Sequence, residues 1–351
     1  MSINIQRYSA VDGFRGLFAL TVLLNHAFNS VTNWTNDVPF KGPHLSVVFF
    51  FMISGFVLTH AHNKEEKFSI YFVTRLLRLW PLVFISTVSM IVIYWSHKVF
   101  GGYLPQEDIF NWRLWLANLS LTHGVFFNDF YVINGPAWSI SIELWASLLI
   151  PVIFVKLTVL MRFLASILLF LLLAWNSDTG LGSNGFWGAY NLLYAIASML
   201  LGSACYSFFS SQNNSLKQYK YIEIFMWVSL FTCFLGIFAQ PAHSNRIDYY
   251  FILAFVPLMG VDFLRDDSFI KRLMNTSILQ FFGYISFPLY LLHFPVLITG
   301  VIYQGNESPN IAILMFISIS ILVSYIYASI IDVPLYRYLK RKIIPTMIKH
   351  S

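Results

Sequence analysis

The first apolar run of the chain carries three side chains that could do chemistry: Asp12, Arg15 and His26. Eleven residues separate Arg15 from His26, which is nearly a whole number of helical turns. A helix would therefore present both on one face, with Asp12 roughly on that face too. At about 1.5 Å per residue, His26 would lie roughly 16 Å from Arg15 along the axis, near the middle of a bilayer. An ionisable group inside a membrane indicates function by default, and imidazole is suited to act as a base or a nucleophile near neutral pH.

Arg75 and Arg78 form a second polar island, just before a predicted membrane span. Because they are three residues apart, a helix would present them on one face. The guanidinium fork matches the geometry of phosphate, so the pair is a candidate anion clamp. With Arg15 at the same predicted inner surface, three arginines could converge on a polyphosphate. The alternative is that Arg75 and Arg78 only anchor the chain at the cytoplasmic surface.

Two further islands interrupt later apolar runs. Ser139 and Glu143 are four residues apart and share a helical face, and a carboxylate at that depth needs a partner or a raised pKa. Tyr290 and His293 share a face in a run that also contains prolines, which bend a helix and free its carbonyls. We take Tyr290 and His293 as candidate substrate-binding residues, although a lone histidine or glutamate can also serve only to join helices.

A metal site is not predicted. His26, Glu143 and His293 fall on separate predicted helices, and no span contains two histidines at metal-binding spacing. Cys205 and Cys233 both lie in apolar runs, which argues against a disulfide framework or a thiolate site.

The composition indicates a polytopic membrane protein, since 57% of the 351 residues are hydrophobic and only 11% are charged. We expect an all-α membrane helix bundle of about ten transmembrane helices, an uncleaved N-terminus and a single domain over residues 1–351 with no extra soluble domain. The net charge of +6 does not predict a nucleic-acid partner, because membrane proteins place basic residues by topology. The predicted spans lie near 16–34, 44–62, 79–97, 138–156, 162–177, 186–208, 222–240, 248–264, 278–302 and 311–333.

Charge distribution sets the predicted topology. Cytoplasmic termini place 18 of the 22 basic residues inside, which agrees with the positive-inside rule. The amphipathic segment 110–128 resembles a span, but counting it as one would move the later basic residues outside. We therefore expect an interfacial or re-entrant segment there, within a long exterior loop at 98–137. The predicted location is the plasma (inner) membrane.

Five motifs, in this order and spacing, resemble acyltransferase family 3 from about residue 7 to residue 336. Members are integral-membrane enzymes that typically move an acetyl or other short acyl group from acyl-CoA to a hydroxyl of a surface or secreted glycan. Some also carry an exterior hydrolase-like domain, which is not expected here. The motifs are Asp12-Gly-x-Arg15-Gly followed by His26, Phe-Phe-x-x-Ser-Gly-Phe56, Arg75-x-x-Arg78-x-x-Pro81, Trp138-Ser-x-Ser-x-Glu143 and Tyr290-Leu-Leu-His293-x-Pro.

The resemblance implies that His26 is the catalytic histidine and Arg15 its essential partner. Arg75 and Arg78 match the paired basic residues near the acyl-CoA entrance. All three arginines are therefore candidate substrate-binding residues.

The fourth motif contributes Trp138, Ser139 and Ser141 as further substrate-binding candidates, together with Glu143. Asp12 or Glu143 could orient the catalytic imidazole and stabilise its charged form, as a carboxylate does in a catalytic triad. The sequence does not decide between these two carboxylates, and both are candidate catalytic residues.

The leading hypothesis is an O-acyltransferase that uses cytoplasmic acyl-CoA, most simply acetyl-CoA. The reaction would be O-acetylation of a glycan or glycolipid, a polysaccharide modification. No tightly bound cofactor is expected. Direct transfer and an acyl-histidine intermediate stay open, as do the acceptor, the acyl length and the oligomeric state. A proton-coupled secondary transporter or flippase using His26, Glu143 and His293 is the main alternative. A receptor or scaffold with polar residues that only join helices is the third.

Overall fold

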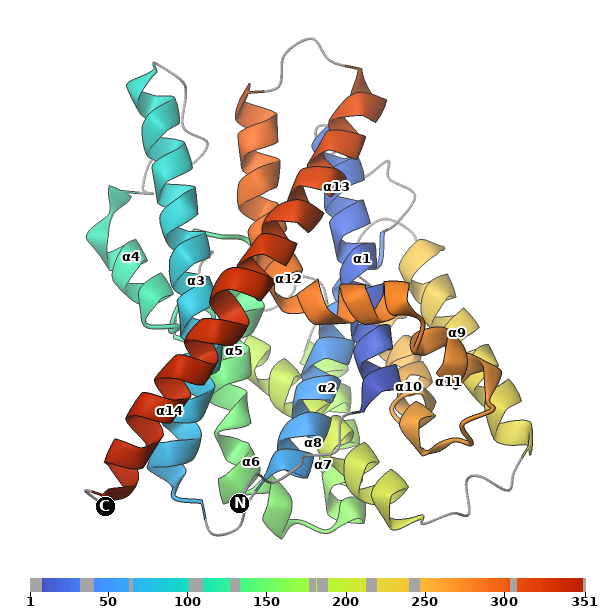
Figure 1. The fold of residues 1–351 in the computed structure, drawn as a ribbon. Coiled ribbons are helices and arrows are strands. Elements are labelled where there is room, and N and C mark those ends of the chain that lie inside the picture. Colours follow the sequence, from blue (N-terminus) through green and yellow to red (C-terminus); the bar gives the residue numbers. More distant parts are fainter. Residues whose placement is uncertain are drawn as a thin grey trace.

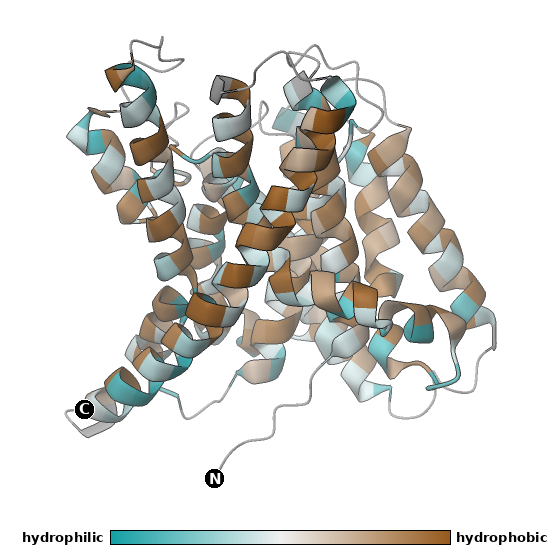
Figure 2. Cartoon of the chain, turned by 45° about the horizontal axis from the view of Figure 1, so that its top comes forward, coloured by the Kyte–Doolittle hydropathy of each residue, from teal (hydrophilic) through white to brown (hydrophobic). Residues whose placement is uncertain are grey.

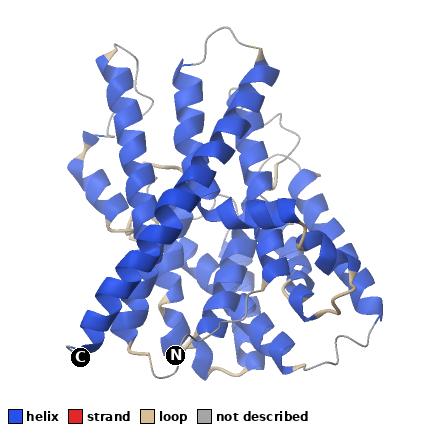
Figure 3. Ribbon diagram, in the orientation of Figure 1, coloured by secondary structure: helices blue, strands red, loops and turns tan. Residues whose placement is uncertain are grey.

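The computed structural model describes residues 8–31, 41–62, 66–100, 110–126, 133–176, 181, 189–212, 220–239, 247–303 and 308–349. Every regular element in these ranges is a helix (Figure 3), as the long apolar runs predict. The elements are α1 (Ser9–Val31), α2 (His44–Ala61), α3 (Phe68–Val99), α4 (Trp112–Leu119), α5 (Ala137–Ser147), α6 (Leu149–Val152), η2 (Phe154–Lys156), α7 (Val159–Asn176), α8 (Ala189–Ser211), α9 (Lys220–Phe238), α10 (Asp248–Leu258), η4 (Val261–Phe263), α11 (Phe269–Met274), α12 (Ser277–Tyr303), α13 (Pro309–Ile326), η5 (Tyr327–Asp332) and α14 (Val333–Lys349).

The protein is a multi-pass membrane helix bundle. Within the described residues, eight helical segments are long and apolar enough to cross a bilayer. They correspond to all predicted spans except those at 16–34 and 248–264, where the structure has α1 and the 11-residue α10. The count of ten crossings and the cytoplasmic position of the termini stay predictions.

Apolar residues run along most of the length of the helices, and many polar residues lie near helix ends (Figure 2), while many large hydrophobic side chains are exposed. On α7, for example, Leu160, Leu164 and Leu168 are 67%, 57% and 67% exposed. Continuous apolar surface of this kind suits contact with lipid tails. The interior also contains clusters of aromatic rings, such as that of Phe18, Phe49 and Phe255.

Segment 110–128 contains one short helix in its described part. This helix, α4, has eight residues and is therefore about 12 Å long, less than half the thickness of a hydrocarbon core. Its length agrees with the expected interfacial or re-entrant segment and not with an eleventh span.

Helix α12 organises the bundle around α1. It begins almost across the bundle and then turns to run upward beside α1 (Figure 1), and Pro288 and Pro295 lie within it. The two helices approach closely because Gly16 faces Gly283, where an added Cβ would collide with backbone atoms of the partner helix. Helices α13, η5 and α14 follow one another without a break, with α13 packed against α12 and α14 against α3.

Candidate active site

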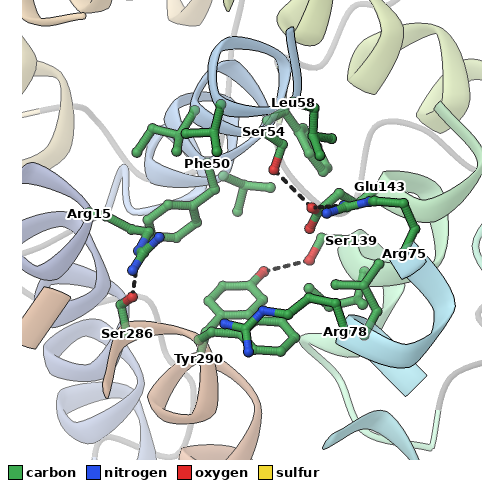
Figure 4. Close-up of a pocket in the computed structure, with 17 residues that line it drawn as sticks. Arg15, Phe50, Ser54, Leu58, Arg75, Arg78, Ser139, Glu143, Ser286 and Tyr290 are labelled. Atoms are coloured by element: carbon green, nitrogen blue, oxygen red, sulfur yellow. Dashed lines mark hydrogen bonds and ion pairs between the residues drawn. The ribbon is translucent and has the colours of Figure 1, made fainter. Parts of the chain in front are cut away.

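Five helices, α1, α2, α3, α5 and α12, enclose a cavity of about 200 Å³ (Figure 4). Its walls are mostly apolar, and its polar groups come from motifs far apart in the sequence. The structure therefore brings Arg15, Arg75 and Arg78 to one cavity. The polar lining residues are Arg15, Ser54, Arg75, Arg78, Ser139, Glu143, Ser286 and Tyr290.

Arg15 is held by α1 and α12 together. Its Nε donates to Ser286 Oγ at 2.8 Å and its Nη2 donates to the Gly283 carbonyl at 2.8 Å. Asp12, one turn earlier on α1, pairs with its Nη1 at 3.2 Å. Asp12 itself does not line the cavity, so it acts on the site through this arginine.

Arg75 and Glu143 form an ion pair across the cavity between α3 and α5. Arg75 Nη2 lies 2.7 Å from Glu143 Oε1, and Ser54 Oγ donates to the same oxygen at 2.8 Å. The Arg75 and Glu143 side chains are only 12% and 14% exposed. The membrane-embedded glutamate thus has the partner that its depth requires.

Arg78 pairs with Asp332, at the inner end of the last predicted span, for which the sequence left open a pairing with an arginine or a role only in ending the helix. Its Nη1 lies 2.6 Å from Asp332 Oδ2, and its guanidinium packs over the ring of Phe287 at 5.1 Å. Asp332 ends the π-helical segment η5, and such segments are frequent at functional sites. The sequence could not specify this ion pair, because the π turn at Asp332 and its contact with α3 exist only in the folded chain.

Ser139 and Tyr290 join α5 to α12 at one wall of the cavity. Ser139 Oγ lies 3.0 Å from Tyr290 Oη, and the Tyr290 ring packs edge-on against Phe50 at 5.6 Å. Tyr290 also lies beside His293, with 6.5 Å between the ring centroids. This tyrosine therefore connects the cavity to the histidines behind it.

His26 and His293 are in direct contact. His26 Nδ1 lies 2.7 Å from His293 Nε2, with the rings stacked at 4.9 Å. Arg15 and His26 both reach α12, as their spacing on one helical face predicts. Neither histidine lines the cavity. Tyr290 does line it, and the Tyr290 ring lies beside His293, so this tyrosine links the cavity to the histidine pair.

Trp138 and Ser141 lie away from the cavity. Ser141 Oγ donates to the Leu121 carbonyl at 2.7 Å and accepts a hydrogen bond from the Gly124 amide at 3.1 Å. Leu121 has a φ of 57°, a strained value for a leucine that these contacts to its carbonyl stabilise. Trp138 is buried in the main core. Ser141 thus holds the segment before α5, and the role of Trp138 and Ser141 toward substrate stays a prediction.

In the described structure the candidate carboxylates pair with arginines, whereas His26 contacts another histidine. Asp12 pairs with Arg15, and Glu143 pairs with Arg75. The catalytic roles predicted for Asp12 and Glu143 stay predictions. In the part of the chain that the structure describes, no three His, Cys, Asp or Glu side chains lie close enough together to hold a metal ion.

Comparison with known families identifies the class to which the chain belongs. Residues 8–329 match a family model described as an acyltransferase domain. The chain therefore belongs to acyltransferase family 3, as the five motifs predict.

Curated relatives are similar over different lengths of the chain. The peptidoglycan O-acetyltransferase OatA of Listeria monocytogenes is 23% identical over 341 residues, covering 86% of this chain and 51% of OatA. Nodulation protein 10 of Rhizobium leguminosarum bv. viciae is 26% identical over 162 residues, covering 40% of this chain and 43% of the relative. The chain thus spans about half the length of these relatives. No solved structure matches it.

Proposed function

We propose that this protein is an O-acyltransferase of the plasma membrane that transfers an acetyl group from cytoplasmic acetyl-CoA to a hydroxyl of a glycan or glycolipid. Family membership and the O-acetyltransferase name of one relative support acyl transfer to oxygen. The observation that carries the proposal is the arrangement of the site. Three arginines line a mostly apolar cavity, and a tyrosine in its wall lies beside His293, which hydrogen-bonds to His26.

The arginines suit the phosphates of an acyl-CoA. Arg15 and Arg78 side chains are 31% and 35% exposed, so a ligand can reach them. Among the described residues, Arg78 uses a single N–H group for its bond to Asp332, and a guanidinium has five. Arg78 can therefore bind a phosphate without first losing its carboxylate partner.

The apolar walls suit the pantetheine arm of the donor, which leads from the phosphates to the thioester. Phe50, Phe51 and Phe287 are among the lining residues. In this arrangement the nucleotide end stays with the arginines and the thioester approaches Tyr290 and His26. An apolar, water-poor passage also protects the thioester from hydrolysis.

His26 supplies the chemistry. An alcohol is a weak nucleophile until a base takes its proton in the transition state. The acceptor oxygen then bonds to the thioester carbonyl carbon, the carbon–sulfur bond breaks, and the proton passes from the imidazole to the leaving thiolate of CoA. An acyl-histidine route would use the same imidazole as nucleophile.

The test is transfer from acetyl-CoA labelled in its acetyl group, in membranes that contain the protein. We expect label in a glycan or glycolipid fraction, loss of this label in His26→Ala, and full labelling in the control His97→Ala, which changes a histidine in the last turn of α3. Undiminished labelling in folded His26→Ala would remove His26 from the mechanism. Movement of a solute with no covalent product would instead favour the transporter.

A further inference from the structure

The part of α12 that carries His293 is fixed from outside the helix. Pro295 has no N–H, so the Leu291 carbonyl lacks its usual helical donor. Asn134, from the segment before α5, fills this place, with Nδ2 donating to the Leu291 carbonyl at 3.0 Å. Asn134 is completely buried. The backbone around His293 is therefore tied to the segment before α5.

The ring of His293 is fixed by a second backbone contact. Its Nδ1 lies 2.8 Å from the Leu289 carbonyl, which can only accept a hydrogen bond, so Nδ1 carries the proton. His293 is 1% exposed and, among the described residues, contacts no carboxylate, which favours a neutral ring. A neutral imidazole with its proton on Nδ1 has its lone pair on Nε2.

The proton position on His293 determines which nitrogen of His26 carries its proton. His293 Nε2 lies 2.7 Å from His26 Nδ1, and since His293 Nε2 is the acceptor, His26 Nδ1 must be the donor. A neutral His26 then carries its lone pair on Nε2, the nitrogen directed away from this bond. Base catalysis and acyl-histidine formation both need a lone pair on a nitrogen that substrate can reach.

We propose that His293 is a positioning residue that holds His26 in the tautomer with Nδ1 protonated, so that the lone pair used in the reaction is on Nε2. The inference rests on the proposed function. His293 takes the place that a carboxylate has in a catalytic triad, with a neutral acceptor in place of a charged one. When His26 Nε2 takes the proton of the acceptor hydroxyl, the bond to His293 stabilises the imidazolium until Nε2 returns a proton to the CoA thiolate.

The first test needs no activity. In protein labelled with ¹⁵N-histidine, NMR shifts distinguish an Nδ1–H from an Nε2–H imidazole, and a difference spectrum against His26→Ala assigns one signal among nine histidines. We expect the Nδ1–H tautomer for His26. An Nε2–H tautomer in the wild-type protein would overturn the inference whatever the enzyme's substrates are.

The second test separates the two contacts of His293. The amide of His293→Gln reaches the position of Nε2 and can still accept from His26, whereas His293→Asn reaches only the position of Nδ1 and keeps the contact with the Leu289 carbonyl. Loss of a buried hydrogen-bond acceptor predicts a kcat about 10- to 100-fold lower in His293→Asn, with most of kcat kept in His293→Gln. The KM for acetyl-CoA stays unchanged in both, because His293 does not line the cavity.

The outcomes distinguish this inference from the proposed function. A role in packing alone would lower the yield of folded protein in both variants without separating their kcat values. Equal kcat losses in His293→Gln and His293→Asn, or a normal kcat in His293→Asn, reject the positioning role while His26→Ala is inactive. If His26→Ala is fully active, the proposed function fails instead.

Discussion

Arg75 and Arg78 belong to one short motif, yet their surroundings predict different consequences of removal. In Arg75→Ala, the Glu143 carboxylate stays buried and loses its counter-charge, and of its contacts with the described residues it keeps the hydrogen bond from Ser54. Removing one partner of a buried ion pair costs about 3–5 kcal/mol. We use the lower end, about 3 kcal/mol, because the two side chains are 12% and 14% exposed. The Asp332 side chain is itself only 10% exposed, but Arg78 is 35% exposed, so water can enter the space that Arg78→Ala leaves beside this carboxylate. The cost of Arg78→Ala should therefore be smaller, about 1 kcal/mol.

Thermal unfolding in detergent, followed by intrinsic fluorescence, measures this difference. At about 2–4 °C per kcal/mol, Arg75→Ala should lower Tm by about 6–12 °C and Arg78→Ala by about 4 °C or less. The paired variant Arg75→Met with Glu143→Leu removes both charges, and its Tm should return close to that of the wild type. Its activity should stay low if Arg75 also binds the donor.

Donor binding is measured on the same variants. Arg78→Ala should raise the KM for acetyl-CoA about tenfold, the effect of losing one charge-assisted hydrogen bond to phosphate. The KM for the acceptor should stay unchanged. Equal Tm values for Arg75→Ala and Arg78→Ala, or a paired variant as unstable as Arg75→Ala, would refute the electrostatic reasoning. An unchanged donor KM in Arg78→Ala would reject the phosphate clamp.

Three further perturbations test the fold. Burial lowers the pKa of His123, in the segment before α5, from 6.5 to about 4. Between these pH values the unfolded state binds more protons than the folded state, so about 3 kcal/mol of stability is lost as pH falls through this range. A pH series of Tm should show this loss, and His123→Gln should reduce it. Gly16→Ala places a Cβ against the backbone of α12 and should abolish the monodisperse peak in size-exclusion chromatography. In the control Gly300→Ala, no described atom lies within 4 Å of the added Cβ, so the peak should stay. Asn134→Ala leaves the Leu291 carbonyl without its donor and should cost about 1–3 kcal/mol in thermal unfolding, which an unchanged Tm would contradict.

Local sequence patterns predicted the helices and the shared face of α1. The apolar runs gave the all-helical architecture, because helix length and hydropathy depend on residues close in the chain. The eleven-residue spacing placed Arg15 and His26 on one face, and both side chains contact α12. The prolines of α12 predicted carbonyls without helical donors. The Leu291 carbonyl is one of these, and it accepts a hydrogen bond from Asn134, which lies outside the helix.

Partners between helices could not be predicted in the same way. The sequence left the partner of His26 open between Asp12 and Glu143, and in the described structure its ring contact is with His293. For Asp332 the sequence left open a pairing with an arginine or a role only in ending the helix, and it did not specify Arg78, with which Asp332 pairs at 2.6 Å. Such contacts join residues more than 200 positions apart, and nothing in local periodicity specifies which helices become neighbours.

The distribution of charges gives a physical reason for a histidine in the position of the usual carboxylate. A charge in an apolar bundle is stable chiefly when a counter-charge is close, so each arginine of the cavity is paired with an acid: Asp12, Glu143 or Asp332. A carboxylate placed beside His26 would need an arginine or a proton of its own. A neutral imidazole with one nitrogen bonded to its own helix backbone can orient His26 without bringing a permanent charge to the membrane interior. The arginines can then serve the anionic donor while the histidine pair serves the reaction, and the two functions are separable by mutation.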